Sequence, residues 1–415
     1  MWLLDRFLKK LVRQGQLIIV ESNGHRHSYG VSEGEAPVTV RFHDPEAPDF
    51  VAIHPYMGSG EAYMDGRMSV DDEDIMGLIR LILKNTVRDN ANMLEGGIIP
   101  RTIQHLTNRF QRLNWEKRSK QNVAHHYDLD GRLYDLFLDK DRQYSCGYFT
   151  DIHNSLDQAQ LDKKIHIASK LDLKSGQRIL DIGCGWGGMA LFLGQIADVE
   201  VLGVTLSEEQ LKIARKRAKE AGLDDRVKFQ LIDYREVKGR FDRIVSVGMF
   251  EHVGPPYYKN FFNHCRDLLT DDGVLLLHTI GRLGLPGTTD PWTNKYIFPG
   301  GYCPALSEIV SASEQSGLIL SDVENLRLHY MYTLNQWYKN VLAARAEIIK
   351  LYDVRFYRMW TFYLAGASAA FQYGQMCNYQ LQYIRKRDSL PLTRDYMFES
   401  EALLREQAKN LSNPE

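Results

Sequence analysis

The stretch RILDIGCGWGG, residues 178–188, decides how the rest of this chain is interpreted. Its first half is an apolar run centred on Leu180, which is typical of a buried parallel strand. The chain then turns through residues 183–185 and begins a helix at about Met189. Glycine lets the backbone approach a ligand where a Cβ would collide, and the N-terminus of a helix offers free N–H groups. The stretch therefore predicts a ligand-binding turn between a strand and a helix.

Strands and helices alternate downstream of this turn. The expected strands, each a short apolar run, are residues 200–204, 227–232, 243–247 and 273–279. The expected helices are residues 189–196, a charged helix ending near residue 221 and a helix ending near residue 269. Alternation at this spacing predicts an α/β fold with a doubly wound parallel sheet, whose ligands bind at the carboxyl ends of the strands.

Two classes of ligand fit the glycine turn. GCGWGG has the GxGxxG spacing of a dinucleotide site, but Val204 and Thr205 stand where such a site needs an acidic residue. Asp181 ahead of the glycines instead resembles the class I S-adenosylmethionine-dependent methyltransferases. The sequence therefore favours a class I methyltransferase (Rossmann-like) sheet.

Composition narrows the class of protein. The 415 residues suffice for two or three domains, and a net charge of −2 gives no sign of a nucleic-acid partner. Five cysteines without a CxxC pair do not suggest disulfides or a metal site. Asp5, Arg6, Lys9 and Lys10 interrupt the first apolar stretch, and no apolar run reaches the length of a membrane span. These features predict a cytoplasmic protein, without a signal peptide, that can still touch a membrane.

The first part of the chain predicts a small α+β domain, residues 1–87. Its first helix, residues 1–15, has an apolar face and a basic side, which suits packing on its own domain or contact with a membrane surface. The expected strands are residues 17–21, 38–42 and 50–54, and a helix is expected over residues 74–85. Residues 88–101 are expected to form a linker.

Beyond the linker, residues 102–120 form a basic helical stretch. Five positive side chains stand against Glu116 alone, namely Arg109, Arg112, Lys117, Arg118 and Lys120. Such a run is either a solvated helix face or a contact with anionic phospholipid head groups.

Six motifs give the chain a family resemblance. Between about residues 122 and 383 it carries, in order, AHHYD, YSCGYF, LDIGCGWGG, GVTLSEEQ, MFEHVG and LHTIG. This combination resembles the cyclopropane-fatty-acyl-phospholipid synthase family and the related mycolic acid cyclopropane synthases. The resemblance implies a methyltransferase domain over residues 102–387, followed by a polar tail over residues 388–415. The N-terminal extension resembles that of the phospholipid-acting members, which predicts a lipid-facing role for it.

The resemblance implies S-adenosylmethionine as the cofactor. The implied contacts are Tyr144 and Ser145 with the methionine part, Gly183, Cys184 and Gly185 beneath it, Thr205, Leu206 and Gln210 toward the ribose, and Asp233 and Tyr234 beside the adenine. Because the acidic residue that usually holds the ribose is missing, Gln210 is our candidate for that hydrogen bond.

The implied reaction is methylene transfer to the cis double bond of an unsaturated phospholipid acyl chain. Methyl transfer to the alkene leaves a carbocation, and a base must then remove a proton so that the cyclopropane ring closes, while water is excluded. The resemblance implies a bound bicarbonate as this base. The residues implied to contact it are Cys146, Glu251, His278, Ile280 through its backbone, and Tyr330.

Most of these five residues also have an ordinary structural explanation. Cys146 alone suits a small buried hydrophobe, His278 a core histidine and Tyr330 a packed aromatic. Glu251 stands out, because it follows an apolar run at the carboxyl end of a strand, where a carboxylate is costly unless it is paired or used. His252 beside it is given no role.

The C-terminal part of the chain is aromatic. Residues 356–383 contain nine aromatic side chains and predict a helix that is either core or a wall of the acyl channel. Residues 288–302 predict an irregular loop over the pocket, and the tail is expected to hold one short helix, residues 399–411.

Three other functions stay open. A related enzyme could make a methyl- or methylene-branched lipid, whereas a small-molecule N- or C-methyltransferase would need neither bicarbonate nor a lipid domain. A catalytically silent lipid-binding protein is disfavoured by the intact motifs. The expected partner is a phospholipid bilayer, with peripheral association at the inner face of the membrane. Head-group preference, double-bond position and oligomeric state, a homodimer included, stay open.

Overall fold

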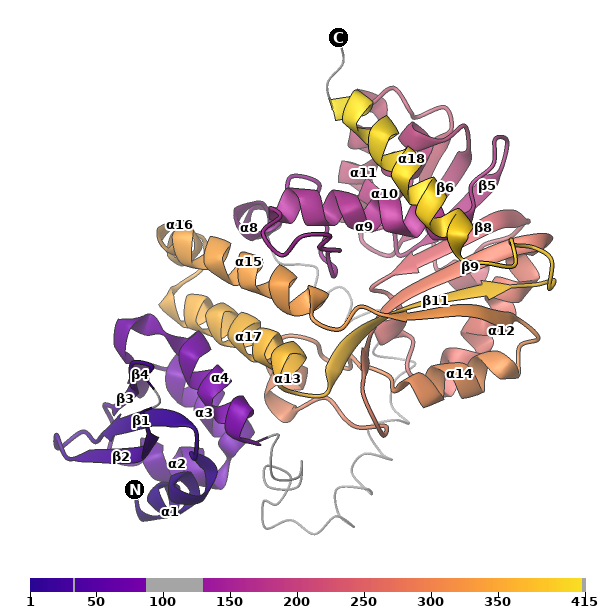
Figure 1. The fold of residues 1–415 in the computed structure, drawn as a ribbon. Coiled ribbons are helices and arrows are strands. Elements are labelled where there is room, and N and C mark those ends of the chain that lie inside the picture. The colour runs from indigo at the N-terminus through magenta and orange to yellow at the C-terminus, as the bar shows by residue number, and fades with distance from the viewer. Residues whose placement is uncertain (33, 87–129, 413–415) are drawn as a thin grey trace. The chain divides into compact units, whose positions relative to one another are not determined.

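A seven-stranded sheet organises the larger part of the molecule (Figure 1). The computed structural model describes residues 1–32, 34–86 and 130–412. Within these ranges the strands of the sheet lie in the order β10-β11-β9-β8-β5-β6-β7. Their bounds are β5 Arg178–Ile182, β6 Glu200–Thr205, β7 Val227–Leu231, β8 Phe241–Val247, β9 Leu269–Arg282, β10 Ile319–Asn325 and β11 Met376–Ile384.

The strand directions confirm the doubly wound parallel sheet. β5 runs parallel to β6 and to β8, β6 runs parallel to β7, and β8 runs parallel to β9. β10 and β11 form an antiparallel pair in the same sheet. The parallel strands therefore place their carboxyl ends at one edge, where a ligand site is expected.

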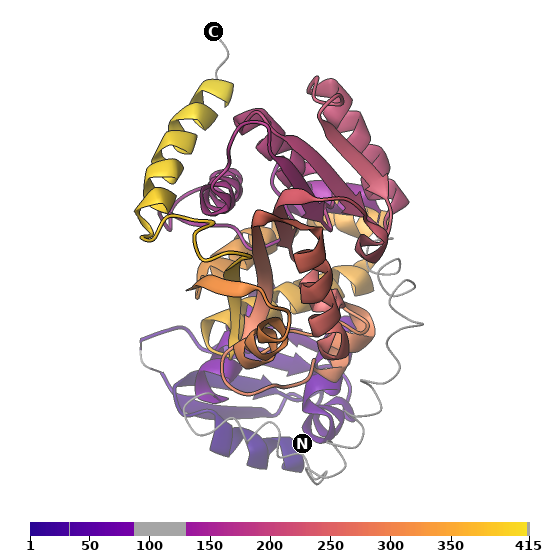
Figure 2. The same ribbon diagram turned by 90° about the vertical axis from the view of Figure 1, so that its right-hand side faces the viewer.

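Helices form a hydrophobic core on each face of this sheet (Figure 1 and Figure 2). Side chains of β5 alternate between the faces, so Leu180 and Ile182 join one core and Ile179 joins the other. The core around Ile179 includes side chains of α9 Leu156–Leu171, α10 Gly188–Ile196, α11 Glu208–Glu220 and α18 Asp395–Ser412. The opposite core includes side chains of α12 Tyr258–Leu268 and α14 Leu306–Glu314.

Contacts divide the described residues into two compact units. One holds the described residues up to 86 together with Thr289–Pro299 and Leu334–Met376, and the other holds the remaining described residues. This grouping differs from the predicted boundary, because α17 Val354–Gln372 packs against α3 Pro55–Met64 and α4 Ile75–Thr86. The predicted linker, the basic stretch and the AHHYD motif lie outside the described residues.

The unit that contains the N-terminus has its own sheet, in the order β2-β1-β3-β4. Its strands are β1 Gly15–Val20, β2 Arg26–Val31, β3 Val38–Phe42 and β4 Met68–Val70. Besides α3, α4 and α17, its helices include α1 Trp2–Leu11, α2 Ala47–Ile53, α13 Pro291–Tyr296 and α16 Arg345–Leu351. The predicted α+β character is confirmed. Nowhere in the described ranges does a helix combine the length and the apolar composition that crossing a membrane requires.

The prediction of a strand over residues 50–54 is wrong. These residues fall at the end of α2, which has Pro48 in its first turn. Proline suits the start of a helix because its fixed φ is helical and its missing N–H would find no partner there. A short apolar run does not distinguish a strand from a helix, and the proline was the signal that could have decided.

The predicted aromatic helix over residues 356–383 is correct only in its first part. α17 ends at Gln372, and the chain then enters β11, whose side chains are almost all buried. Tyr379 and Tyr383 therefore belong to a strand. The last helix is longer than predicted, since α18 covers Asp395–Ser412. The predicted loop over residues 288–302 contains the short helix α13.

Candidate functional site

A cavity of about 290 Å³ lies at the carboxyl ends of β5, β6, β7 and β8. Its volume is at the lower end of the usual range for small-molecule sites. All ten residues predicted to bind the cofactor line it, namely Tyr144, Ser145, Gly183, Cys184, Gly185, Thr205, Leu206, Gln210, Asp233 and Tyr234. These ten residues therefore lie around one cavity, and their contact with the cofactor stays a prediction.

The glycine turn gives the cavity its floor. Gly183 has φ +80° and Gly185 has φ +53°, backbone conformations that side chains with a Cβ rarely adopt. A Cβ on Gly183 would lie 2.9 Å from the side chain of Met249, whereas a Cβ on Gly185 would meet no atom within 4 Å. Gly183 is therefore required by packing, and Gly185 leaves open space that a ligand can use.

Gln210 is oriented by the turn before α11. The hydroxyl of Thr205 donates to Gln210 Oε1 at 2.9 Å, and Ser207 caps the helix by accepting from the Gln210 N–H at 3.3 Å. The Gln210 side chain is buried and lines the cavity. Gln210 thus presents a buried side-chain amide to the cavity from the first turn of α11.

Asp233 and Tyr234 follow β7 at the next strand end. The Asp233 carboxylate is buried and binds the Arg235 guanidinium through two hydrogen bonds of 2.9 and 2.6 Å. The Tyr234 carbonyl accepts from His264 at 2.8 Å, and its ring lies edge-on to Phe261. These contacts hold both residues at the cavity wall.

Side chains of α9 form hydrogen bonds with the segment that carries Tyr144 and Ser145. Lys163 donates to Gln143 Oε1 at 2.6 Å and to Ser145 Oγ at 2.8 Å, while Gln160 donates to the Ser145 carbonyl at 2.9 Å. Lys163 is fully buried, and burial lowers its pKa to about 8. Sequence reasoning missed both α9 residues. The available signal was a helix whose polar residues leave it no clean apolar face.

Several buried polar atoms on residues that line the cavity lack hydrogen-bond partners within the described part of the chain. Two of them are Asp181 Oδ2 and Trp186 Nε1. Burial raises the pKa of Asp181 to about 7, although Lys163 and the Ala190 N–H act in the opposite direction. Such orphaned groups fit a polar ligand that pairs with them. Together with the glycine floor they fit the amino-acid end of S-adenosylmethionine.

His252, left without a role by the sequence, also lines the cavity. Burial lowers its pKa to about 4, so its ring is neutral near pH 7. A neutral wall at this point avoids repulsion of a cationic sulfonium.

Glu251 and Ile280 form the most direct contact among the five residues predicted to surround bicarbonate. The Ile280 N–H donates to Glu251 Oε1 at 2.6 Å. Glu251 Oε2 is buried and has no hydrogen-bond partner among the described residues. Burial raises the pKa of Glu251 to about 7, although the bond from Ile280 works against this rise. The carboxyl group therefore changes its charge near neutral pH.

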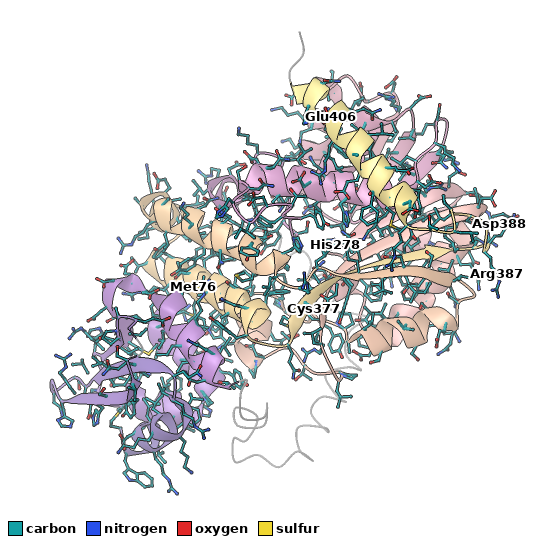
Figure 3. The ribbon with its side chains drawn as sticks, in the orientation of Figure 1. Met76, His278, Cys377, Arg387, Asp388 and Glu406 are labelled. Carbon is teal, nitrogen blue, oxygen red and sulfur yellow. The ribbon has the colours of Figure 1, made fainter. Side chains whose placement is uncertain are left out.

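Side-chain amides of β11 lie close to both ring nitrogens of His278, which is labelled in Figure 3. Its Nε2 lies 2.9 Å from Asn378 Nδ2, and its Nδ1 lies 3.2 Å from Gln380 Nε2. Burial, with the positive charges of Lys163 and Lys170, lowers the pKa of this imidazole. His278 is thus a neutral side chain bound to β11.

Cys146 and Tyr330 are linked through their neighbours. The Cys146 thiol is buried, points to the Gly147 carbonyl at 3.3 Å and has its pKa raised by burial. The Gly147 N–H donates to Thr333, one turn beyond Tyr330 on α15 His329–Ala343. None of the five predicted residues is among those that line the described cavity. Their role as an anion site stays a prediction.

The chain was compared with known proteins. Residues 114–381 match the family model described as mycolic acid cyclopropane synthetase. The cyclopropane-fatty-acyl-phospholipid synthase of Escherichia coli (strain K12) is 41% identical over 341 residues, which cover 82% of this chain and 86% of that protein. A probable fatty acid methyltransferase of Pseudomonas putida is 40% identical over 301 residues, covering 69% and 76%.

A solved structure agrees with the fold. The mycolic acid cyclopropane synthase CmaA1, in complex with SAH and CTAB, is 32% identical, with a TM-score of 0.60 over 64% of this chain and 98% of its own. The sheet order and the cavity at its carboxyl edge are those of a class I S-adenosylmethionine-dependent methyltransferase. With a family match over most of its length, the chain belongs to the mycolic acid cyclopropane synthetase family of S-adenosylmethionine-dependent methyltransferases.

Proposed function

We propose that the protein transfers a methylene group from S-adenosylmethionine to the cis double bond of an unsaturated phospholipid acyl chain, giving a cyclopropane ring. The observation that carries this proposal is the convergence of all ten predicted cofactor residues on one cavity. The 41% identity to a cyclopropane-fatty-acyl-phospholipid synthase supports the choice of substrate. CTAB, a detergent with one long alkyl chain, occupies a relative of similar fold, which fits an acyl substrate.

When bound, S-adenosylmethionine supplies an electrophilic methyl group. Asp181 and Trp186 present unpaired polar atoms that would hold the methionine end, while Gln210 would bind the ribose. The glycine floor at Gly185 lets the backbone pass close beneath. The protein's part in this step is to align the alkene with the methyl group and to exclude water.

After methyl transfer, one proton must be removed from the substrate. The carbocation on the substrate closes to a ring when a proton leaves the added methyl group. We propose that a bicarbonate anion takes this proton and that Cys146, Glu251, His278, Tyr330 and the Ile280 N–H surround it. The unpartnered Glu251 Oε2 fits an acceptor for the hydroxyl of that anion. Binding would require the Ile280 N–H to exchange its bond from Glu251 to the anion.

The proposed membrane contact involves α1. Trp2 is 69% exposed and Leu3 is 44% exposed, while Leu4, Leu8 and Leu11 are buried on the other side of the helix. Exposed large apolar residues near basic ones suit the interface of an anionic membrane. We propose that α1 contributes to peripheral binding at the inner face of the membrane.

Paired substitutions Trp2→Ser and Leu3→Ser test this contact. Binding to vesicles containing phosphatidylglycerol should fall about threefold or more, and wild-type binding should weaken as salt is added. Val31→Ser is the matched control, because Val31 is also 69% exposed but lies on β2. Equal vesicle binding by both variants would remove α1 from the proposal. Deleting residues 1–87 is a poorer test, because α17 would lose its packing against α3 and α4.

A second product deserves a direct test, because a probable fatty acid methyltransferase is nearly as similar, at 40% identity. That protein's name is consistent with a methyl- or methylene-branched chain. Lipids from cells that express the protein should gain one CH₂ on monounsaturated chains by mass spectrometry. Cyclopropane protons in the NMR spectrum of those lipids would support our proposal. Vinylidene protons would contradict it and would show that the product is a methylene-branched chain.

A further inference from the structure

The last described helix lies along a buried polar helix. α18 packs against α9 and α10, and it begins after residue 381, where the family match ends (Figure 1). Ala408 of α18 is buried in the core, and Glu401 and Arg405 face α9. Glu406 is exposed and pairs with Lys409 on the same helix (Figure 3). One side of α18 is therefore built to meet charges on α9.

The centre of this contact is His166 on α9. Its Nε2 lies 2.7 Å from Glu324 Oε2 on β10, and its Nδ1 lies 3.0 Å from Glu401 Oε2 on α18. An ionised carboxylate can only accept hydrogen bonds, so both ring nitrogens of His166 must donate. Donation from both nitrogens requires a doubly protonated, positively charged ring.

Both carboxylates are held in their ionised form. Burial would raise the pKa of Glu324, but hydrogen bonding to His166 and the charge of Lys170 hold it at about 2. Burial also opposes ionisation of Glu401, yet hydrogen bonds to His166 and Arg405 lower its pKa below the usual range. Both carboxylates thus act as acceptors, as the geometry around His166 requires.

The charges around His166 balance. On α9 the ring's neighbours are Lys170 and Asp162; β10 supplies Glu324, and α18 supplies Glu401 and Arg405. Lys170 pairs with Glu324, and Arg405 bridges Asp162 and Glu401. With His166 positive, three positive groups face three negative groups. With His166 neutral, this largely buried cluster would carry an uncompensated negative charge, which is costly.

His166 also forms one layer of a stack of three rings. Its ring lies 4.0 Å from that of Tyr148 at an angle of 11°, and Tyr148 lies 4.8 Å from His329 at 4°. His329 Nδ1 accepts from the Phe149 N–H at 2.9 Å, and burial lowers the pKa of His329 to about 4. Tyr148 is therefore clamped between a cationic ring and a neutral one, and a cation over an aromatic face is attractive.

The stacked ring of Tyr148 belongs to the same segment as two residues that line the cavity. Tyr148 follows Tyr144 and Ser145, which line the cavity, by only a few residues, and His329 directly precedes Tyr330. A second branch of the cluster reaches β9, because Lys170 donates to Gln380 at 2.7 Å and Gln380 contacts His278. His166 itself does not line the cavity.

We propose that His166 is a positioning residue, kept doubly protonated by Glu324 and Glu401, which fixes Tyr148 and thereby the segment that binds the cofactor. On this view α18 supplies the carboxylate that keeps the ring charged. The inference rests on the proposed function only in taking that segment as the cofactor site. Its tests measure cofactor binding and proton occupancy without any lipid substrate, so a different lipid product would leave it standing.

The first test is spectroscopic. In the full-length wild-type protein labelled with ¹⁵N-histidine, the signal of His166, assigned by its loss in His166→Gln, should show both ring nitrogens protonated at pH 7. A signal with one unprotonated nitrogen at pH 7 would overturn the proposal. This measurement needs no variant at Glu401 to fold.

The second test is the pH profile of S-adenosylmethionine affinity, measured by calorimetry. Affinity should depend on pH in the wild type, and Glu401→Gln should change that dependence, since one of the two carboxylates that face His166 becomes a neutral amide. At the acid end of the profile Glu401→Gln should bind as wild type does. Glu406→Gln is the matched control on the exposed side of α18 and should leave the profile unchanged.

Each other result has a defined meaning. A lower unfolding temperature of Glu401→Gln with an unchanged affinity profile would make α18 a purely stabilising element and overturn the positioning role. Equal shifts for Glu401→Gln and Glu406→Gln would also overturn it, because the effect would then come from the net charge of the helix.

Discussion

The cofactor cavity and the five residues predicted to hold the anion lie in the same unit but differ in how their polar groups are satisfied. The cavity keeps unpaired polar atoms on Asp181 and Trp186 and an open space above Gly185. In the other set Glu251 Oε2 is also unpaired, but the Ile280 N–H donates to Glu251 Oε1, and both ring nitrogens of His278 lie within 3.2 Å of side-chain amides on β11. The first region is prepared for a ligand, and the second has largely closed on itself.

This difference suggests different energetics of binding. A ligand in the cavity gains hydrogen bonds with groups that would otherwise be buried without partners, so it removes an existing cost. An anion among the five residues must first displace existing hydrogen bonds, so its net gain per contact is smaller. We therefore expect tight binding of the cofactor and weak, reversible binding of the proposed anion.

The largest expected effect concerns the five residues predicted to hold the anion. Glu251→Gln keeps the size of the side chain and removes its charge, so turnover should fall at least about 100-fold, as for loss of a group that manages a proton. Cofactor affinity should stay nearly unchanged, because Glu251 does not line the cavity. The measurements are turnover on vesicles and calorimetry with S-adenosylmethionine.

Bicarbonate separates the two candidates for the base in the same experiment. Wild-type enzyme in rigorously degassed buffer should regain activity when millimolar bicarbonate is added. Indifference to bicarbonate, combined with complete inactivity of Glu251→Gln, would make Glu251 itself the base.

The next largest effect concerns the cofactor cavity. Gly185→Val places a branched side chain where no protein atom lies within 4 Å and where φ is +53°. Cofactor affinity should fall at least about tenfold because the side chain occupies ligand space. Circular dichroism should report a retained fold. Unchanged affinity by calorimetry would show that the cofactor does not use the space above Gly185.

The pH dependence of turnover should follow Glu251. Its pKa of about 7 lies above the usual 4.5, so it is mostly protonated at pH 6 and becomes a carboxylate as the pH rises. If the carboxylate is the active form, turnover at constant bicarbonate should rise about tenfold from pH 6 to pH 8. The folded state holds this proton more tightly than the unfolded state. The stability of the folded protein should therefore decrease as the pH rises from 4.5 to about 7. A flat profile between pH 6 and 8 would separate Glu251 from the proton transfer.

The smallest expected effect concerns Asp181. Asp181→Asn keeps the shape but replaces an acceptor that has no partner, so cofactor affinity should fall about fivefold, which corresponds to the loss of one ordinary hydrogen bond of about 1 kcal/mol. Trp186→Phe removes the other unpaired atom and is the paired comparison. If neither variant changes affinity, the cavity is not the methionine end of the site.

All ten cofactor residues were implied by the family resemblance. Eight of them lie at or just after the ends of β5, β6 and β7, whose carboxyl ends meet at one edge whatever the rest of the fold does, whereas Tyr144 and Ser145 follow no strand of this sheet. Gln160 and Lys163 could not be predicted, since their role depends on the burial of α9 beneath a segment to which no local pattern ties it. The engagement of His278 was hidden for a similar reason. Its partners stand on β11, which the aromatic pattern assigned to a helix.

The order of strands has a consequence for how the protein is made. β11 lies between β10 and β9, although it follows both of them in the sequence. While the ribosome is still synthesising residues before 376, β9 has an unpaired edge and His278 has no amide beside it. Unpaired strand edges are where nascent chains associate with one another. We therefore expect the nascent chain to be prone to association during the interval between completion of β9 and arrival of β11.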